Sequence, residues 1–162
     1  MTKQFSVRAV RCHHQATDEE VYESLVRATT PLTRAWEKLE KAKRIALKFN
    51  MGHTKVAHFE GRRRELVDEA TCRAVLRLLR ERTSAVLVAT DTFGYDEAGE
   101  LSPYLNYLPL LQEFDVEYAE SNLAPFAEYE VPGGGYMFQR YTLNECFREA
   151  DEVISVAKMK NH

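Results

Sequence analysis

The chain has few of the residues that mark several classes of protein. Its 162 residues include three cysteines, five prolines and seven glycines, and no two cysteines form a Cys-x-x-Cys pair. This spacing excludes a disulfide scaffold, a zinc ribbon and an iron–sulfur cluster built from this segment. No apolar run approaches the ~20 residues of a membrane span. Charges interrupt every short apolar stretch at the N-terminus, which is not typical of a signal peptide. We therefore expect a cytoplasmic protein.

The composition of the chain is typical of one folded domain. Apolar residues make up 44% of it, enough for a hydrophobic core. The formal net charge is −3. That value hides an asymmetry, because residues 1–82 hold 18 Lys and Arg against 11 Asp and Glu, whereas the remaining residues hold 4 against 14. Such a split is typical of a chain with two partners or of an internally complementary fold. We favour the interpretation that the two halves lie against each other or that the charges lie on solvated helix faces.

Strand and helix patterns alternate along the chain. Apolar and polar residues alternate over Phe5–Val10 as in a strand, although Val10 departs from the pattern. Helical spacing follows from Thr17, again over 32–39, and from about Glu65 to Arg82. Thr142 with Glu145 forms a capping-box pattern that predicts another helix start. The remaining predicted segments are short strands at 44–50, 85–91, 114–120 and 153–157, a loop at 51–64, a helix at 103–111 and a hairpin around 131–135.

This alternation predicts a single α/β domain over residues 1–162, with three layers, a largely parallel sheet and helices on both faces. Ligands of such sheets bind at the carboxyl ends of the strands. In this chain, polar residues follow four of the apolar runs directly. They are Lys48-Phe49-Asn50, Thr90-Asp91-Thr92, Glu120-Ser121-Asn122 and the terminal segment Lys158-Met159-Lys160-Asn161-His162.

Three of these segments, in the same order, resemble the domain-of-unknown-function 362 family. The ending from Glu149 to His162 is similar to its signature of an acid, a strand and Lys-x-Lys-Thr-His. Residues 45–51 resemble its strand-Lys-Pro-Asn signature, and residues 68–91 resemble its helix followed by a strand that ends in an acid. Phe49 stands where the family usually has Pro, and Asn161 where Thr is usual.

The resemblance implies a longer family domain, because members commonly continue with a Lys-Asn-x-x-Gly element and many carry a cysteine cluster further on. We therefore expect that this chain is the N-terminal part of such a domain. The family's frequent coupling to iron–sulfur modules implies redox chemistry. This segment contains no cluster ligands, and the cofactor stays unknown.

Lys158, Lys160 and His162 alternate, so in an extended chain they project to one side. Two ammonium groups and an imidazole there form either an anion site or a general acid–base set; the alternative is an exposed basic tail. They are the candidate catalytic residues. Lys48, Asn50 and Asp91 are the candidate cofactor-binding residues. Asp91 suits a metal, a ribose hydroxyl or a lysine partner as well as a simple turn cap.

Other motifs carry weaker predictions. His53 is the one weak candidate for a metal ligand, and no set of ligands completes it. Arg62-Arg63-Arg64 has no aromatic platform beside it and the pI is about 6.0, so nucleic-acid binding is not expected. The sequence thus predicts an α/β domain that binds an anionic small molecule or cofactor at the carboxyl ends of its strands, and the resemblance implies a redox-linked enzyme. The alternative is a non-catalytic module whose basic first half docks an acidic partner.

Overall fold

A computed structural model describes residues 7–51, 56–92 and 107–159 of the chain. In chain order its helices and strands are α1 (Asp18–Thr29), α2 (Thr33–Leu39), β1 (Arg44–Phe49), β2 (His58–Phe59), β3 (Arg62–Arg63), α3 (Glu69–Arg82), β4 (Val86–Asp91), α4 (Leu108–Glu113), β5 (Glu117–Glu120), β6 (Phe126–Glu130), β7 (Arg140–Asn144), α5 (Cys146–Glu149) and β8 (Glu152–Val156).

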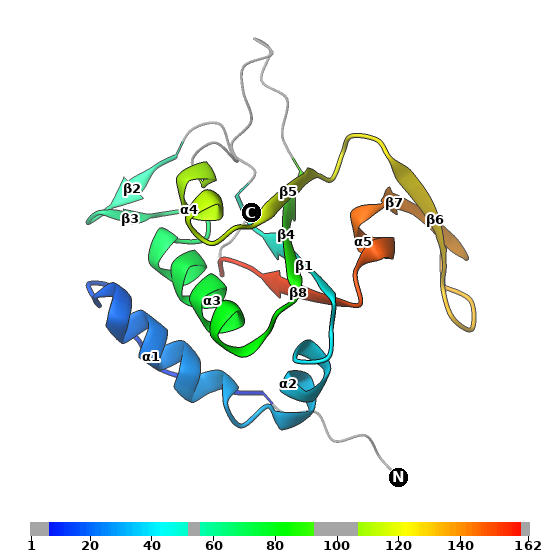
Figure 1. Cartoon of the computed structure of the whole chain (residues 1–162). Coiled ribbons are helices and arrows are strands. Elements are labelled where there is room, and N and C mark those ends of the chain that lie inside the picture. The colour runs from blue at the N-terminus through cyan, green and yellow to red at the C-terminus, as the bar shows by residue number, and fades with distance from the viewer. Residues whose placement is uncertain (1–6, 52–55, 93–106, 160–162) are drawn as a thin grey trace.

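The central sheet has four strands in the order β5-β4-β1-β8, and every neighbouring pair is parallel. Figure 1 shows α3 on one side of this sheet and α5 on the other. The prediction of a three-layer α/β fold with a parallel sheet is therefore confirmed. Two small antiparallel ribbons, β2–β3 and β6–β7, lie outside the sheet.

The core lies between the sheet and the larger helical layer. Alternate residues of β1 and β4 point into it, and Ile45, Leu47 and Leu87 are fully buried. Strand side chains alternate between faces, so these residues share one face. Trp36 from α2, Leu76 from α3 and Leu110 from α4 pack into the same cluster. The remaining face is covered more thinly, by α5 and its neighbours.

The structure differs from the sequence predictions at several elements. The 51–64 segment was predicted as a loop but holds the β2–β3 hairpin. α3 begins at Glu69 rather than near Glu65, because the Asp68 carboxylate caps the Ala70 N–H. Residues 7–10 of the predicted strand at Phe5–Val10 have no regular secondary structure, and residues 5 and 6 lie outside the described part.

The capping-box prediction at Thr142 is wrong. Thr142 lies within β7, where it pairs with Glu128 of β6. The next helix, α5, begins only at Cys146, whose N–H donates to the side-chain oxygen of Asn144 at 2.9 Å and not to Thr142. A two-residue pattern carries little free energy, so the antiparallel pairing of a whole strand overrides it.

Candidate functional site

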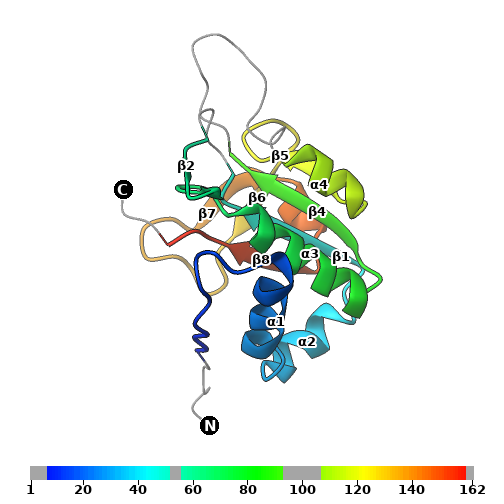
Figure 2. The ribbon, with the colours of Figure 1, turned by 90° about the vertical axis from the view of Figure 1, so that its left-hand side faces the viewer.

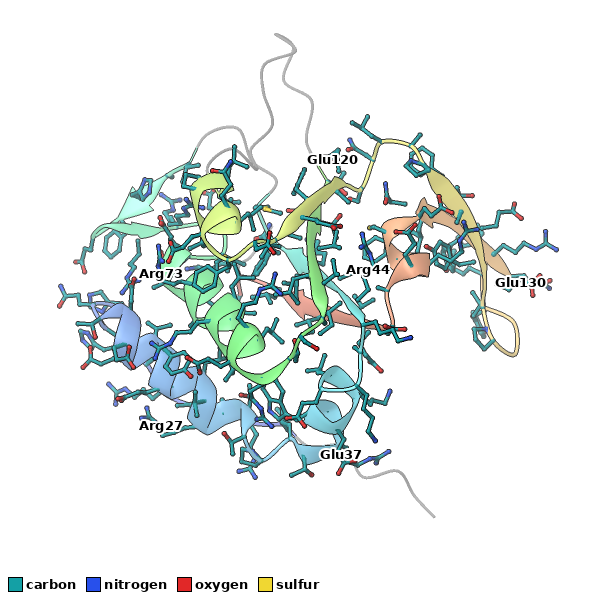
Figure 3. The ribbon with its side chains drawn as sticks, viewed as in Figure 1. Arg27, Glu37, Arg44, Arg73, Glu120 and Glu130 are labelled. Carbon is teal, nitrogen blue, oxygen red and sulfur yellow. The ribbon has the colours of Figure 1, made fainter. Side chains whose placement is uncertain are left out.

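The carboxyl ends of all four central strands lie along one edge of the sheet, because the strands are parallel. In the register, Lys48 of β1 lies beside Thr90 of β4, and Asp91 lies beside Glu120 of β5. Glu120 is labelled in Figure 3, at the end of its strand. Four polar segments that are far apart in the sequence therefore meet at one edge, which is where parallel α/β sheets bind ligands.

Lys48 and Asp91 form an ion pair at the centre of this edge. The Lys48 Nζ lies 2.9 Å from Asp91 Oδ1, with the lysine side chain 41% exposed and the aspartate 7% exposed. The other carboxylate oxygen, Oδ2, accepts a hydrogen bond of 2.6 Å from the Met51 N–H. Asp91 therefore fixes both the lysine and the backbone that leaves β1. Of the alternatives raised by its position, the structure places a lysine partner at Asp91.

Asn50 follows β1 in the chain, and its backbone is fully used. Its N–H donates to the Val156 carbonyl, and its carbonyl accepts from the Val67 N–H. Its side-chain oxygen Oδ1 is buried without a hydrogen-bond partner among the described residues. A buried polar atom of this kind is uncommon in a native protein. The Asn50 amide therefore has the capacity to bond a ligand.

Two hydroxyl groups lie at the carboxyl ends of β4 and β5. Thr92, just after β4, and Ser121, just after β5, place their Oγ atoms 2.8 Å apart. The Ser121 N–H also donates to the Asp91 carbonyl. The sequence indicated both residues only as part of polar strand ends, and it gave no signal that the two hydroxyls touch.

Lys158 lies at the carboxyl end of β8 but does not join the Lys48–Asp91 pair. Its Nζ donates to the Arg63 carbonyl at 3.2 Å. The side chain is half-buried, and within the described ranges its ammonium group forms no ion pair with a carboxylate. It lines a cavity of about 370 Å³ between α1 and the N-terminal segment; the polar members of that lining are Cys12, His13, His14, Ser24, Arg62, Asp68, Thr71 and Lys158.

Arg62 holds the wall of this cavity in place. Its guanidinium group donates to Asp68 Oδ2 at 2.6 Å and to the carbonyls of His14 and Ala16. It therefore ties the segment before α1 to the start of α3. Arg63 is 7% exposed and stacks its guanidinium 4.0 Å from the ring centre of Tyr107. The sequence showed these arginines as a basic run and did not reveal that both are built into the fold.

Burial raises the pKa of two side chains of the hydrophobic core, Tyr107 and Cys72. Desolvation raises the pKa of the Tyr107 hydroxyl well above its usual range, so it stays protonated and donates to the Val67 carbonyl at 2.8 Å. Desolvation also raises the pKa of the Cys72 thiol. Neither group is therefore an acid or a nucleophile near neutral pH.

Three predicted site residues, His53, Lys160 and His162, lie outside the described residues. Within the described ranges, no three His, Cys, Asp or Glu side chains gather closely enough to hold a metal ion. The described helices include none that is long and apolar enough to cross a membrane.

The comparisons with known proteins give one match. Searches of curated proteins and of solved structures found no significant match. A family model described as "Domain of unknown function (DUF362)" matches residues 45–162. This range runs from the second residue of β1 to the last residue and contains the rest of the central sheet, whereas α1 and α2 precede it. Because the model covers well over half of the sequence, the chain belongs to the DUF362 family.

Proposed function

We propose that this domain binds an anionic small molecule or cofactor at the carboxyl edge of its sheet. One observation carries the proposal: the half-buried Lys158 side chain lines a cavity of about 370 Å³, and its ammonium group has a carbonyl, not a carboxylate, as its partner. A partly desolvated charge normally has an opposite charge beside it. A phosphate or carboxylate group in the cavity would supply that charge.

Lys48 takes a different part in this proposal. Asp91 already neutralises it, so the pair adds no net positive charge for an anion. The pair offers instead polar groups at the carboxyl ends of β1 and β4, where the side-chain oxygen Oδ1 of Asn50 also has no hydrogen-bond partner among the described residues. A ligand that contacts the carboxyl ends of the strands therefore has an anionic group that binds Lys158. Lys160 and His162 follow Lys158 in the chain. A hydrogen-bond donor elsewhere on the ligand would suit Asn50. A redox role rests on the family resemblance alone.

The alternative function, docking of an acidic partner by the basic first half, has less support. Arg62 and Arg63 are engaged inside the fold, and of that run Arg64 alone is well exposed, at 66%. Other basic side chains of the first half already pair with acids of the second half. Exposed positive charge that forms no ion pair among the described residues remains at Arg8, Arg11, Arg34, Lys41 and Lys43, so an acidic partner would have to bind these side chains and not the arginine run.

Inorganic phosphate tests the anion site. We expect phosphate to raise the melting temperature of the unmodified chain. A ligand at about 100 times its Kd stabilises a protein by about 2.7 kcal/mol. The double variant Lys158→Gln with Lys160→Gln should lose this shift.

The chain offers a matched control in Lys41→Gln with Lys43→Gln. This second Lys-x-Lys pair is exposed and precedes β1, at the amino ends of the parallel strands. Removing the same two charges there should leave the phosphate shift unchanged. An equal loss in both double variants would show a general charge effect and overturn the proposed site.

A further inference from the structure

The two outer strands of the central sheet, which form its lateral edges, differ in their chemistry. β5 is one edge strand, with the sequence Glu-Tyr-Ala-Glu, and charges of this kind protect an edge from further pairing. β8 is the other edge; its first residue, Glu152, is charged, whereas the following run Val153-Ile154-Ser155-Val156-Ala157 contains no charge, proline or glycine. An uncharged edge rich in β-branched residues is a template for another strand.

The backbone of β8 leaves hydrogen-bonding groups free along this edge. Val156 directs its carbonyl to the Asn50 N–H and so bonds toward β1. In a parallel strand, alternate residues bond to opposite sides, so Val153, Ser155 and Ala157 direct their N–H and C=O groups outward. Among the described residues none pairs with them, and β8 ends the strand order.

An apolar groove of about 570 Å³ accompanies the free edge. It runs between β8 and the helices α1, α2 and α3, with Leu25, Trp36 and Val75 among its lining residues. Ile154 and Val156 point toward these helices, because they share the face of the core. A strand laid on the edge would therefore bury every second side chain in the groove, and those side chains should be apolar.

The chain itself contains a segment with this pattern near the groove. Val7 and Ala9 alternate with Arg8 and Val10, yet Val7 is 94% exposed. Val10 and Cys12 line the same cavity as Lys158, the residue that follows the β8 edge. Figure 2 shows this N-terminal segment beside α1. The end of this exposed segment and the residue that follows the unpaired β8 edge thus line one cavity.

The topology favours this occupant and fixes its direction. Because the segment passes Lys158 at its carboxyl end, residues 7–10 laid on the edge would run parallel to β8. The connection through α1 and α2 to β1 would then pass over the same face as α3 and move across the sheet in the same direction as β1–α3–β4. Both crossovers would have the same hand, as parallel α/β sheets require.

We propose that the segment around Val7–Val10 docks on β8 as a fifth parallel strand, with Val7 and Ala9 in the groove. Docking covers the free edge and fixes Cys12, His13 and His14 as one wall of the cavity beside Lys158. This inference concerns the backbone of β8 and stands independently of any anion in the cavity.

Amide hydrogen exchange on the full chain tests the docking. The Val153, Ser155 and Ala157 amides should exchange at least about 10-fold more slowly than in a variant with residues 1–10 deleted. Val7→Asn with Ala9→Asn should release the same three amides, whereas the control Arg8→Asn should not. The Ile154 and Val156 amides bond to β1 and stay protected in every folded variant, so they report that the domain is intact.

Two results would overturn the proposal. Free exchange of the three outward amides in the unmodified chain would show that the edge stays open. Protection that survives the deletion, or that falls on dilution with loss of a dimer, would identify a second copy as the occupant. A synthetic peptide of residues 3–14 added to the deletion variant should restore protection if the segment itself is the strand.

Discussion

At the scale of single residues, the fold depends on a few polar side chains that each hold more than one element. Asp91 is the clearest of them, since its carboxylate binds both the Lys48 ammonium and the Met51 N–H. Bonds of this kind to a charged, nearly buried acceptor are worth more than neutral ones. The ends of β1 and β4 are therefore fastened to each other at the candidate site.

Asp91→Asn should lower the free energy of unfolding by about 1–3 kcal/mol, because it removes the charge from two hydrogen bonds in a poorly solvated place. Urea unfolding at neutral pH measures the change. Asp115→Asn is the control, since that side chain is exposed and surface changes usually stay within about 0.5 kcal/mol. Equal stability of the two variants would contradict the role given to Asp91.

At the scale of elements, β8 is fastened to β1 at its start as well as along its length. The Asp151 carboxylate, just before β8, accepts hydrogen bonds from the Lys43 and Arg44 N–H groups at 2.7 and 3.0 Å. These backbone donors hold the pKa of Asp151 below its usual range. A carboxylate with a lowered pKa in the folded state stabilises that state only while it is ionised.

Asp151→Asn should therefore lower the free energy of unfolding near pH 7. This loss should become smaller as the pH falls. The contribution of the carboxylate is fully present above its unfolded pKa of about 3.9 and is lost as the pH falls through the lower folded value. Urea unfolding of both proteins across the acid range measures the difference, with Asp115→Asn again as the control. A difference that does not depend on pH would show that the charge of Asp151 is irrelevant.

At the scale of the whole molecule, the basic and acidic halves of the sequence lie against each other. Arg44, labelled in Figure 3, reaches Glu117 at 2.7 Å and Glu149 at 3.6 Å. Lys38 lies 3.3 Å from Glu152, and Arg73 and Lys48 also pair with acids beyond residue 82. These pairs are consistent with the internally complementary interpretation of the charge asymmetry, while Arg77 and Arg82 pair with acids of their own half, Glu19 and Glu40.

Salt should consequently weaken the fold slightly. Screening reduces the attraction between the halves, and exposed pairs are worth about 0–1 kcal/mol each. Raising NaCl from about 0.05 M to about 0.5 M should lower the free energy of unfolding by roughly 1–2 kcal/mol. If repulsion between like charges within each half dominated instead, the same salt would raise the free energy of unfolding. The sign of the change therefore distinguishes attraction between the halves from repulsion within them.

The order of the elements and the parallel class of the sheet could be predicted from the sequence, because apolar periodicity is a local property. The same patterns placed Lys48 and Asp91 at strand ends and so at one edge. Local patterns misled where distant partners decide: Thr142 looks like a helix cap, but its pairing with Glu128 makes it part of a strand. The start of α3 at Glu69 is set locally, by the Asp68 cap on the Ala70 N–H, which the apolar periodicity alone did not reveal.

The sequence by itself thus determined which residues reach the carboxyl edge of the sheet, since strand length and alternation are written in neighbouring residues. The tertiary structure alone decided how those residues are used. It pairs Lys48 with Asp91 across 43 residues of chain. It turns Lys158 toward the Arg63 carbonyl and the cavity beside α1. Such contacts depend on how strands and helices pack, and no stretch of neighbouring residues contains that information.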